Sequence, residues 1–416
     1  MEQHLLFEVG LALGIIALAG LLSSRLRFSI VPLLILAGML VGPQTPSFGV
    51  LDFRFIDSAP LIEFLGRLGI LFLLFHLGLE FSVGRLVKAG RSIIRGGIIY
   101  MAINLTLGLL LPFLLGWPFK EILIVAGITT ISSSAIVAKM IVDLKRTVRP
   151  ETEMILGLMM FQDVFVAVYL SVVSGLVLTG ATSTMNVLAS AGLALGFIIG
   201  IVFLGRRLLS KLNTILNIPS DEVFMLVLFA ILVIIAGFSE TIHVAEAIGA
   251  LLVGLVLGET EHRERIDKLV VPFRDLFGAI FFFSFGLSID PLALGGAVLP
   301  ALAAVVLTLI GNFISGMIAG RMSGYSQMAS TNVGLTITSR GEFSIILAKL
   351  AMTGGLLPIL QPFAALYVLI LAVLGPLLTK ESRWIYTRLS RIFRWPALKG
   401  KEKPKQKQKK AVAESS

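Results

Sequence analysis

Hydrophobic positions in this chain form long, almost unbroken runs, unlike the short alternations of a soluble strand or amphipathic helix. A helix crosses a bilayer with about 20 mostly apolar residues, and most of these runs approach or exceed that length. The runs are thirteen in number: 4–23, 28–42, 61–80, 95–116, 121–140, 154–179, 187–207, 222–239, 241–258, 271–288, 292–319, 328–352 and 361–379. This pattern predicts an all-α polytopic membrane protein with about 13 transmembrane helices.

Composition agrees with a membrane-embedded chain. Of its 416 residues, 56% are hydrophobic and only 14% are charged, whereas a soluble domain carries about 25% charged residues. The 41 glycines suit membrane helices whose backbones approach one another closely. Because the chain has no cysteine, disulfides and thiolate metal sites are excluded.

Lysines and arginines collect in every second loop, after the odd-numbered runs. They are Arg25, Arg27, Arg85, Lys88, Arg91, Lys145, Arg146, Arg149, Arg206, Arg207, Lys211, Arg263, Arg265, Lys268 and Lys380. The other loops hold little beyond Arg54 and Lys120. Since basic residues mark cytoplasmic loops, we expect the N-terminus outside and the C-terminus in the cytoplasm. The net charge of +10 is therefore a topology signal, and we expect no nucleic-acid partner.

The segment after the last run has a different character. Residues 381–395 mix apolar and basic side chains, as is typical of a helix lying in the inner membrane interface. Residues 399–410 are rich in lysine and predict a disordered tail near anionic lipid head groups. The expected organisation is a transmembrane domain, 1–380, followed by a cytoplasmic interfacial helix and basic tail, 381–416.

Two runs contain matching polar interruptions, Gly127–Ser134 and Gly334–Gly341, and their alignment pairs Ser132 with Ser339. The two runs are seven apart, so they cross the membrane in opposite directions, which is the mark of inverted-topology repeats. The repeats span about 28–179 and 241–380. Because Ser and Thr hydroxyls compete with the helix ladder, we expect two discontinuous helices that cross. The alternative is two ordinary helices whose hydroxyls bond back to their own carbonyls.

One acid lies near the middle of a long apolar run. Asp163 is nine residues in from Met154, which puts it about 14 Å deep if the run begins there. A carboxylate at that depth is costly, so such residues usually line a polar pathway. The alternative is a later membrane entry that leaves Asp163 near the interface.

The two interruptions and Asp163 are predicted to lie at one depth. Together they would supply oxygens from Thr129, Thr130, Ser132, Ser133, Gln162 and Asp163. Oxygen ligands suit hard monovalent cations, and the absence of His and Cys at this level argues against a transition-metal site. A carboxylate that binds either a cation or a proton is the minimum device for exchange. We expect no resident metal and no cofactor.

Arg340, within the second interruption, and Glu342, directly after it, are the candidate charges of the second crossing helix. Arg340 is interpreted as a fixed positive charge for the helix crossing, with an ion pair to Glu342 or Asp163 as the alternative. If both stood on one helix, Glu342 would face about 200° away from Arg340. Glu342 is therefore expected to stay outside the site, which leaves a single exchanging carboxylate and an electroneutral cycle.

Three further pairs of polar residues can be interpreted as structural or as functional. Glu63 and Arg67 have the spacing of an ion pair on one helix. His243 and Glu246 suggest a solvated funnel, with a metal site as the alternative. His76 and Glu80 are expected near the inner mouth.

These motifs resemble a known family. The segments ISSSAIVAK (131–139), FQD (161–163) and SRGEFS (339–344) resemble the second group of monovalent cation/proton antiporters, which includes the Kef potassium-efflux proteins, and most closely its KhtU type. The resemblance covers about 7–381. It implies a homodimer in a bacterial cell membrane, with a core domain that moves against a dimerisation domain.

The resemblance also assigns residues and partners. It places the essential aspartate on Asp163 and the preceding polar residue on Gln162, in a combination like that of the potassium-handling branch. It implies a separate soluble cytoplasmic regulatory subunit, because the sequence ends without the nucleotide-binding domain of the Kef proteins. The predicted function is exchange of potassium or a similar monovalent cation for protons. Sodium/proton exchange, a gated cation channel and an intramembrane hydrolase are the alternatives, and we expect no enzyme activity.

Overall fold

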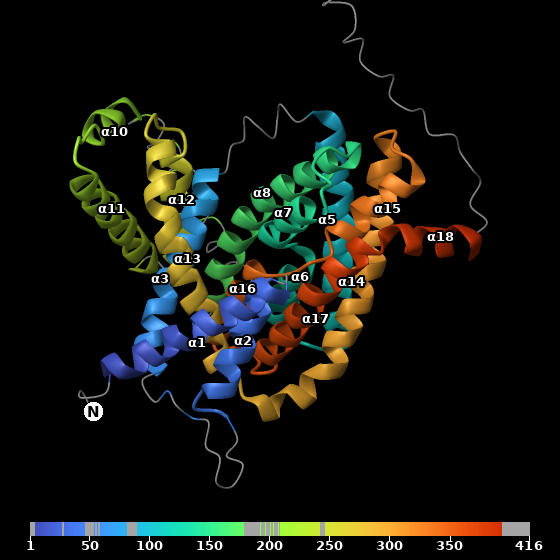
Figure 1. The fold of residues 1–416 in the computed structure, drawn as a ribbon, viewed down its shortest axis with the longest axis horizontal. Helices are drawn as coiled ribbons and strands as arrows, with labels where there is room; N and C mark the ends of the chain where they lie inside the picture. The colour runs from blue at the N-terminus through green and yellow to red at the C-terminus, as the bar shows by residue number, and fades with distance from the viewer. Residues whose placement is uncertain are drawn as a thin grey trace, which may run out of the picture.

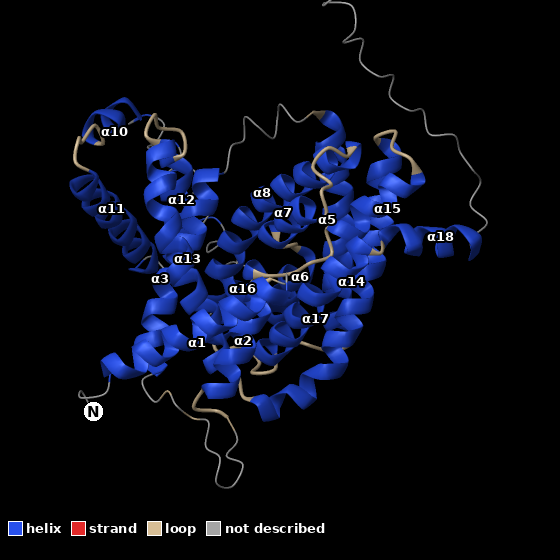
Figure 2. Cartoon of the chain, viewed as in Figure 1, coloured by secondary structure: helices blue, strands red, loops and turns tan. Residues whose placement is uncertain are grey.

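The computed structural model describes residues 5–26, 29–45, 59–80, 90–178, 209–241 and 246–392, together with seven single residues between these ranges. Within this part of the chain every regular element is a helix (Figure 2). The helices are α1 (Leu5–Leu26), α2 (Ile30–Val41), α3 (Ala59–Glu80), α5 (Arg91–Leu114), α6 (Phe119–Thr130), α7 (Ser134–Asp143), α8 (Pro150–Leu178), α10 (Leu209–Ile215), α11 (Asp221–Thr241), α12 (Glu246–Leu257), α13 (Arg263–Leu287), the 3-10 helix η2 (Pro291–Ala293), α14 (Leu294–Met322), α15 (Gln327–Thr336), α16 (Glu342–Thr353), α17 (Leu360–Lys380) and α18 (Ser382–Ile392).

The predicted fold class is confirmed. Eight of the described helices are long and apolar enough to cross a membrane, and shorter apolar helices lie beside them. Each of the two runs with a polar interruption forms a pair of shorter helices, α6 with α7 and α15 with α16. The seventh predicted run, 187–207, lies outside the described residues except for single positions.

Two helix boundaries differ from the apolar pattern because polar residues extend the helices. α13 begins at Arg263, eight residues before the predicted run. Its first turns are held by Arg265, which donates to Asp221 and to the Ile218 carbonyl. The segment 210–220, between the seventh and eighth predicted runs, is in part the short helix α10.

The long helices form two groups (Figure 1). We call α1, α2, α3, α11, α12 and α13 the panel group, in which α3 packs along both α12 and α13. We call α5, α6, α7, α8, α14, α15, α16 and α17 the core group, in which α14 packs along α5, α15 and α17. In Figure 1, α11, α12 and α3 lie to the left, and α5, α14 and α15 lie to the right.

Glycines determine the close packing inside each group. A Cβ atom on Gly38 or Gly286 would meet the backbone of the facing helix, so α2 and α13 touch along their main chains. Gly78 and Gly254 do the same for α3 and α12. Without a side chain at these positions, two helix backbones approach within van der Waals contact. The glycine-rich composition thus builds each group as a tightly packed body.

The face at the top of Figure 1 carries α10, the turn between α12 and α13, and the start of α15. We call it the basic face, because the turns that reach it contain Lys145, Arg146, Arg263 and Lys268. The opposite face carries the start of α3 and the start of α17. The predicted helix within 381–395 is present as α18, which packs near α15 and α17 and extends to the side (Figure 1). Residues beyond Ile392 lie outside the described part.

Candidate functional site

Two broken helices meet in the middle of the core group. α6 ends at Thr130 and α7 begins at Ser134, while α15 ends at Thr336 and α16 begins at Glu342. The two extended segments touch, because the Ser133 N–H donates to the Ser339 carbonyl at 2.9 Å. The expected discontinuities are therefore present, and the alternative of two continuous helices is wrong.

The crossing brings four helix ends together. The carbonyl ends of α6 and α15 carry partial negative charge, and the N-terminal ends of α7 and α16 carry partial positive charge. Inside a bilayer no water is present to form hydrogen bonds with these helix ends, so each end needs a polar partner from the protein. The side chains around the crossing provide these partners.

Arg340 donates hydrogen bonds to the carbonyl ends of α6 and α15. Its guanidinium is fully buried and donates to the Thr129 carbonyl at 2.8 and 3.1 Å and to the Ile337 carbonyl at 3.1 Å. A further donation goes to the Ser132 hydroxyl at 3.1 Å. Arg340 thus lies where the sequence interpretation puts a fixed positive charge. Its described hydrogen bonds go to carbonyls and a hydroxyl, not to Glu342 or Asp163, so the alternative ion pair is not observed.

Two buried tyrosines join the same cluster, and the sequence interpretation missed them. The Tyr100 hydroxyl, from α5, donates to the Thr130 carbonyl at 3.1 Å and contacts the Ser132 hydroxyl. The Tyr367 hydroxyl, from α17, donates to the Thr129 carbonyl at 3.1 Å. A tyrosine well inside an apolar run is the signal that was available, because a buried phenol needs a hydrogen-bond partner.

Glu342 lies at the N-terminal ends of α7 and α16. It is the first residue of α16, and its Oε2 accepts from the hydroxyl of Ser133, the N-cap residue of α7, at 2.9 Å. The expectation that Glu342 points away from the site is therefore wrong. The helical wheel that gave 200° does not apply, because α16 begins only at Glu342 and Arg340 belongs to the extended segment.

α8 presents Gln162 and Asp163 to the crossing. The Gln162 Oε1 accepts from the Ser132 N–H at 2.8 Å, so this amide satisfies a backbone donor that the break leaves free. Asp163 is half-buried, and its Oδ1 is a buried atom with no hydrogen-bond partner in the described part of the chain. A carboxylate oxygen is thus left without a hydrogen bond next to the crossing.

All six residues that were predicted to supply oxygen ligands lie at or beside the crossing. Most of their side-chain oxygens already form hydrogen bonds to other groups of the protein. The hydroxyls of Thr129 and Thr130 bond back to carbonyls of α6. The Ser132 hydroxyl donates to the Ile337 carbonyl at 2.6 Å. Asp163 keeps a carboxylate oxygen without a hydrogen bond in the described structure, and the Nε2 of Gln162 is also unpaired there. The role of the six residues in cation binding stays a prediction.

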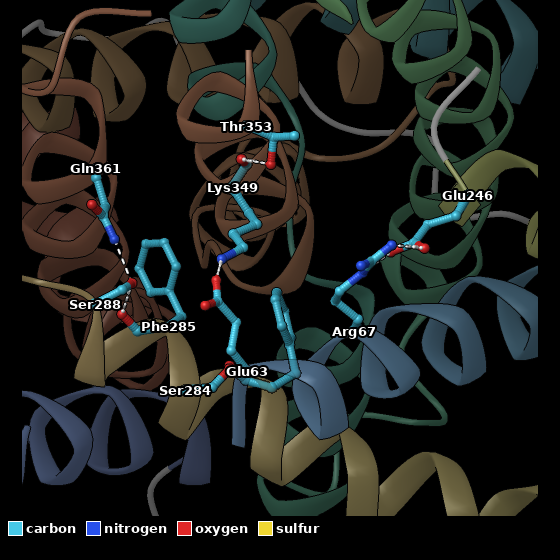
Figure 3. A network of polar contacts seen from close by, with 10 residues as sticks. Glu63, Arg67, Glu246, Ser284, Phe285, Ser288, Lys349, Thr353 and Gln361 are labelled. Atoms are coloured by element: carbon cyan, nitrogen blue, oxygen red, sulfur yellow. Dashed lines mark hydrogen bonds and ion pairs between the residues drawn. The ribbon is translucent and has the colours of Figure 1, made fainter. Parts of the chain in front are cut away.

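The expected pair of Glu63 with Arg67 is wrong. Glu63 pairs with Lys349 of α16, and Arg67 pairs with Glu246 of α12 at 2.7 Å (Figure 3). His243 lies outside the described residues, so its expected funnel or metal site with Glu246 cannot be placed. In the described ranges, no three His, Cys, Asp or Glu side chains gather as a metal site would require.

A cluster of charges joins α3 and α13 toward the basic face. His76 contacts Arg274 at 2.5 Å, Asp267 at 3.2 Å and Glu80 at 3.4 Å. Through His76 these contacts tie the end of α3 to α13 within the panel group.

Comparisons with known proteins match nearly the whole chain. A family model described as "Sodium/hydrogen exchanger, transmembrane" matches residues 13–380. The chain is 62% identical over 393 residues to the "K(+)/H(+) antiporter subunit KhtU" of Bacillus subtilis, covering 94% of this chain and 97% of that protein. It is 31% identical to the "Ammonium/H(+) antiporter subunit AmhT" of Alkalihalophilus pseudofirmus, covering 90% and 92% of the two chains.

Solved structures match in fold. The sodium proton antiporter MjNhaP1 of Methanocaldococcus jannaschii superimposes with a TM-score of 0.65 at 17% sequence identity, covering 92% of this chain and 98% of that one. At this identity the likeness bears on the arrangement of helices alone.

Proposed function

Because this chain belongs to the transmembrane sodium/hydrogen exchanger family, we propose that it is a secondary antiporter that exchanges potassium, or a similar monovalent cation, for protons. The observation that carries the proposal is the free carboxylate oxygen of Asp163 at the crossing of two broken helices. The name of the Bacillus subtilis relative supports potassium, and that of the second relative makes ammonium the next cation to test.

In the proposed cycle, Asp163 holds either one cation or one proton. Hard cations are bound by oxygen, and a carboxylate that is protonated has lost the charge that attracts them. Cation and proton therefore compete for the same group. The core group moves against the panel group and so exposes Asp163 to one side of the membrane at a time.

Arg340 and Glu342 are fixed charges in this cycle. Arg340 is bound to the carbonyl ends of α6 and α15, and Glu342 lies at the N-terminal ends of α7 and α16 with a donor from Ser133. Each charge thus offsets the partial charges of the helix ends beside it. We infer that only Asp163 gains and loses its ion, that the cycle is electroneutral, and that its physiological direction is cation efflux.

The electroneutral cycle predicts that voltage leaves the equilibrium cation gradient unchanged. The measurement uses proteoliposomes in which the membrane potential is clamped at zero and at about −100 mV, a step worth roughly 2.3 kcal/mol per net charge moved. Potassium, ammonium, rubidium and sodium are compared as the driving cation. A gradient that shifts with voltage contradicts the single-carboxylate cycle and points to Glu342 as a second exchanging acid.

The same vesicles separate an antiporter from a gated channel. An antiporter moves protons when cation is added and reaches a maximal rate, whereas a channel brings the membrane potential to the equilibrium value of the cation. Glu342→Gln serves as the companion variant, because it keeps the shape of the side chain and removes its charge. If wild-type exchange is independent of voltage and this variant still exchanges in the same way, Glu342 is not an exchanging acid; a voltage dependence that is present in the wild type and lost in this variant identifies Glu342 as the second acid.

We propose that the protein lies in the plasma membrane of a bacterium, with the basic face and the C-terminus in the cytoplasm. The positive-inside rule and the basic turns of that face support this orientation. The exchanger domain is 1–380, with repeats of about 28–179 and 241–380, and 381–416 is the cytoplasmic interfacial helix and basic tail, close to membrane lipids. We also propose a homodimer, as the family resemblance of the sequence implies.

Regulation by a soluble cytoplasmic protein is expected at the basic face, around 263–268 and 381–401. The word "subunit" in the names of two relatives supports a second component. We predict that such a protein restrains transport and that truncation after Arg394 raises exchange in its presence. Removal of 411–416 alone is the matched control. Exchange that the longer truncation leaves unchanged while the co-purified protein is present contradicts this prediction, as does a full-length preparation from which no protein co-purifies.

A further inference from the structure

A cavity of about 540 Å³ opens between the panel and core groups on the side away from the basic face. Its walls are α3 and α12 of the panel group and α8 and α16 of the core group. Glu63, Arg67, Glu246 and Lys349 line it, so charged side chains of both groups face the same space. The cavity thus has the position and polarity of an aqueous entrance.

The cavity does not reach the site. It is also lined by Ile70, Leu170 and Ile346, which are buried. Leu170 is seven residues along α8 from Asp163, a rise of about 10 Å. An apolar layer therefore separates the cavity from Asp163, and the protein is closed toward this face.

Two side-chain contacts bridge the groups beside this cavity (Figure 3). The Lys349 ammonium of α16 donates to the Glu63 carboxylate of α3. The Gln361 amide of α17 donates to the Ser288 hydroxyl, at the end of α13, at 2.5 Å. The Arg67 pair with Glu246 is different, because both partners belong to the panel group.

We propose that the Glu63–Lys349 ion pair is a gate latch that holds the two groups closed on the face away from the basic turns, and that must break for Asp163 to open to the cavity. The proposal rests on the alternating access of the proposed function. Its geometric basis is α16, which begins at Glu342 in the site and presents Lys349 seven residues later, about 10 Å away. Since a short helix moves as a unit, a shift of the site relative to α3 also pulls Lys349 from Glu63.

The exposure of the pair suits a latch that opens in every cycle. The Lys349 side chain is 18% exposed and that of Glu63 is 46% exposed. Ion pairs with this access to water are weak, and breaking one changes an equilibrium by about two- to fivefold. A fully buried pair would resist opening, whereas this one biases the closed state and still releases it.

The test uses a thiol cross-link, which is simple because the native chain has no cysteine. The variant Glu63→Cys with Lys349→Cys is purified, reconstituted and treated with a short bifunctional thiol reagent that contains a reducible disulfide. We expect cation/proton exchange to be lost on cross-linking and restored on reduction. The matched control is Arg67→Cys with Glu246→Cys, whose cross-link stays within the panel group and is expected to leave exchange unchanged.

Each outcome decides the proposal. Exchange that persists in the cross-linked Glu63/Lys349 variant overturns the latch, as does a failure of these two positions to cross-link under conditions that join the control pair. Absence of exchange in the untreated wild-type protein contradicts the proposed function instead. Charge reversal gives a second readout: Lys349→Glu alone should change the exchange rate about two- to fivefold, and adding Glu63→Lys should restore it. No restoration by the reversed pair counts against a direct ion pair.

Discussion

Replacement of Asp163 by asparagine is expected to abolish cation-driven proton movement, to below about one-hundredth of the wild-type rate, because the amide has no proton to exchange at working pH. The fold should be retained. The Oδ1 of Asp163 accepts no hydrogen bond in the described part, so the substitution removes no contact there, and the amide has nearly the same shape. The measurement is proton uptake by proteoliposomes after addition of potassium, with size-exclusion chromatography as the check on folding.

A matched control for this variant is Asp290→Asn. Asp290 caps η2 near the face opposite the basic face, and its Oδ1 accepts a hydrogen bond from the Leu292 N–H. The same change from carboxylate to amide there should leave exchange close to wild type. Exchange at the wild-type rate in Asp163→Asn contradicts the central role of this carboxylate. Equal loss in both variants shows that the effect does not come from the site.

Replacement of Arg340 by alanine is expected to cause a severe loss of folded protein. The change leaves buried carbonyls of Thr129 and Ile337 without a guanidinium donor. The Tyr367 and Ser132 hydroxyls still donate to these two carbonyls, so the loss comes from the hydrogen bonds of the guanidinium itself. A hydrogen bond from a charged group contributes about 1.5–3 kcal/mol, so losing the bonds to both carbonyls should cost at least about 3 kcal/mol in total. The measurement is the yield of monodisperse protein and its thermal unfolding in detergent.

Arg67→Ala is the control for the loss of an arginine. The Arg67 side chain is 42% exposed and its partners are carboxylates at the cavity, so its removal should cost about 1 kcal/mol or less. Arg340→Lys keeps the charge but not the planar fork, and it should fall between the two. Equal loss of folded protein in Arg340→Ala and Arg67→Ala contradicts the role of Arg340 at the crossing.

The helices and their interruptions were predictable from the sequence because the physical signals are local. A long apolar run has few alternatives to a membrane helix, and a cluster of Ser and Thr weakens the helix at its own position. The breaks after Thr130 and Thr336 therefore lie where the matching motifs put them. The depth of Asp163, counted from Met154, stays a prediction, and α8 itself begins four residues earlier at Pro150.

Partners that come from distant parts of the chain were not predictable. Lys349 is 286 residues from Glu63, so the spacing of Glu63 and Arg67 on one helix suggested a closer but wrong pair. The direction of Glu342 depended on the residue at which α16 begins, because Arg340 lies before that helix and a helical wheel does not relate the two side chains. Tyr100 and Tyr367 lie in apolar runs, and only the three-dimensional packing shows which carbonyls they reach.

The glycine contacts have a consequence for where the molecule can shear. Gly38 with Gly286 and Gly78 with Gly254 mesh the backbones of the panel group, and Gly316 meets the backbone of Gly334 in the core group. Among the described glycines with close neighbours, none meets an atom of the other group. Two helix backbones in contact at glycines cannot slide past each other without separating, whereas contacts between side chains can rearrange as rotamers change. If the two groups move against each other as proposed, we expect the sliding along the boundary between them, which no described glycine contact crosses.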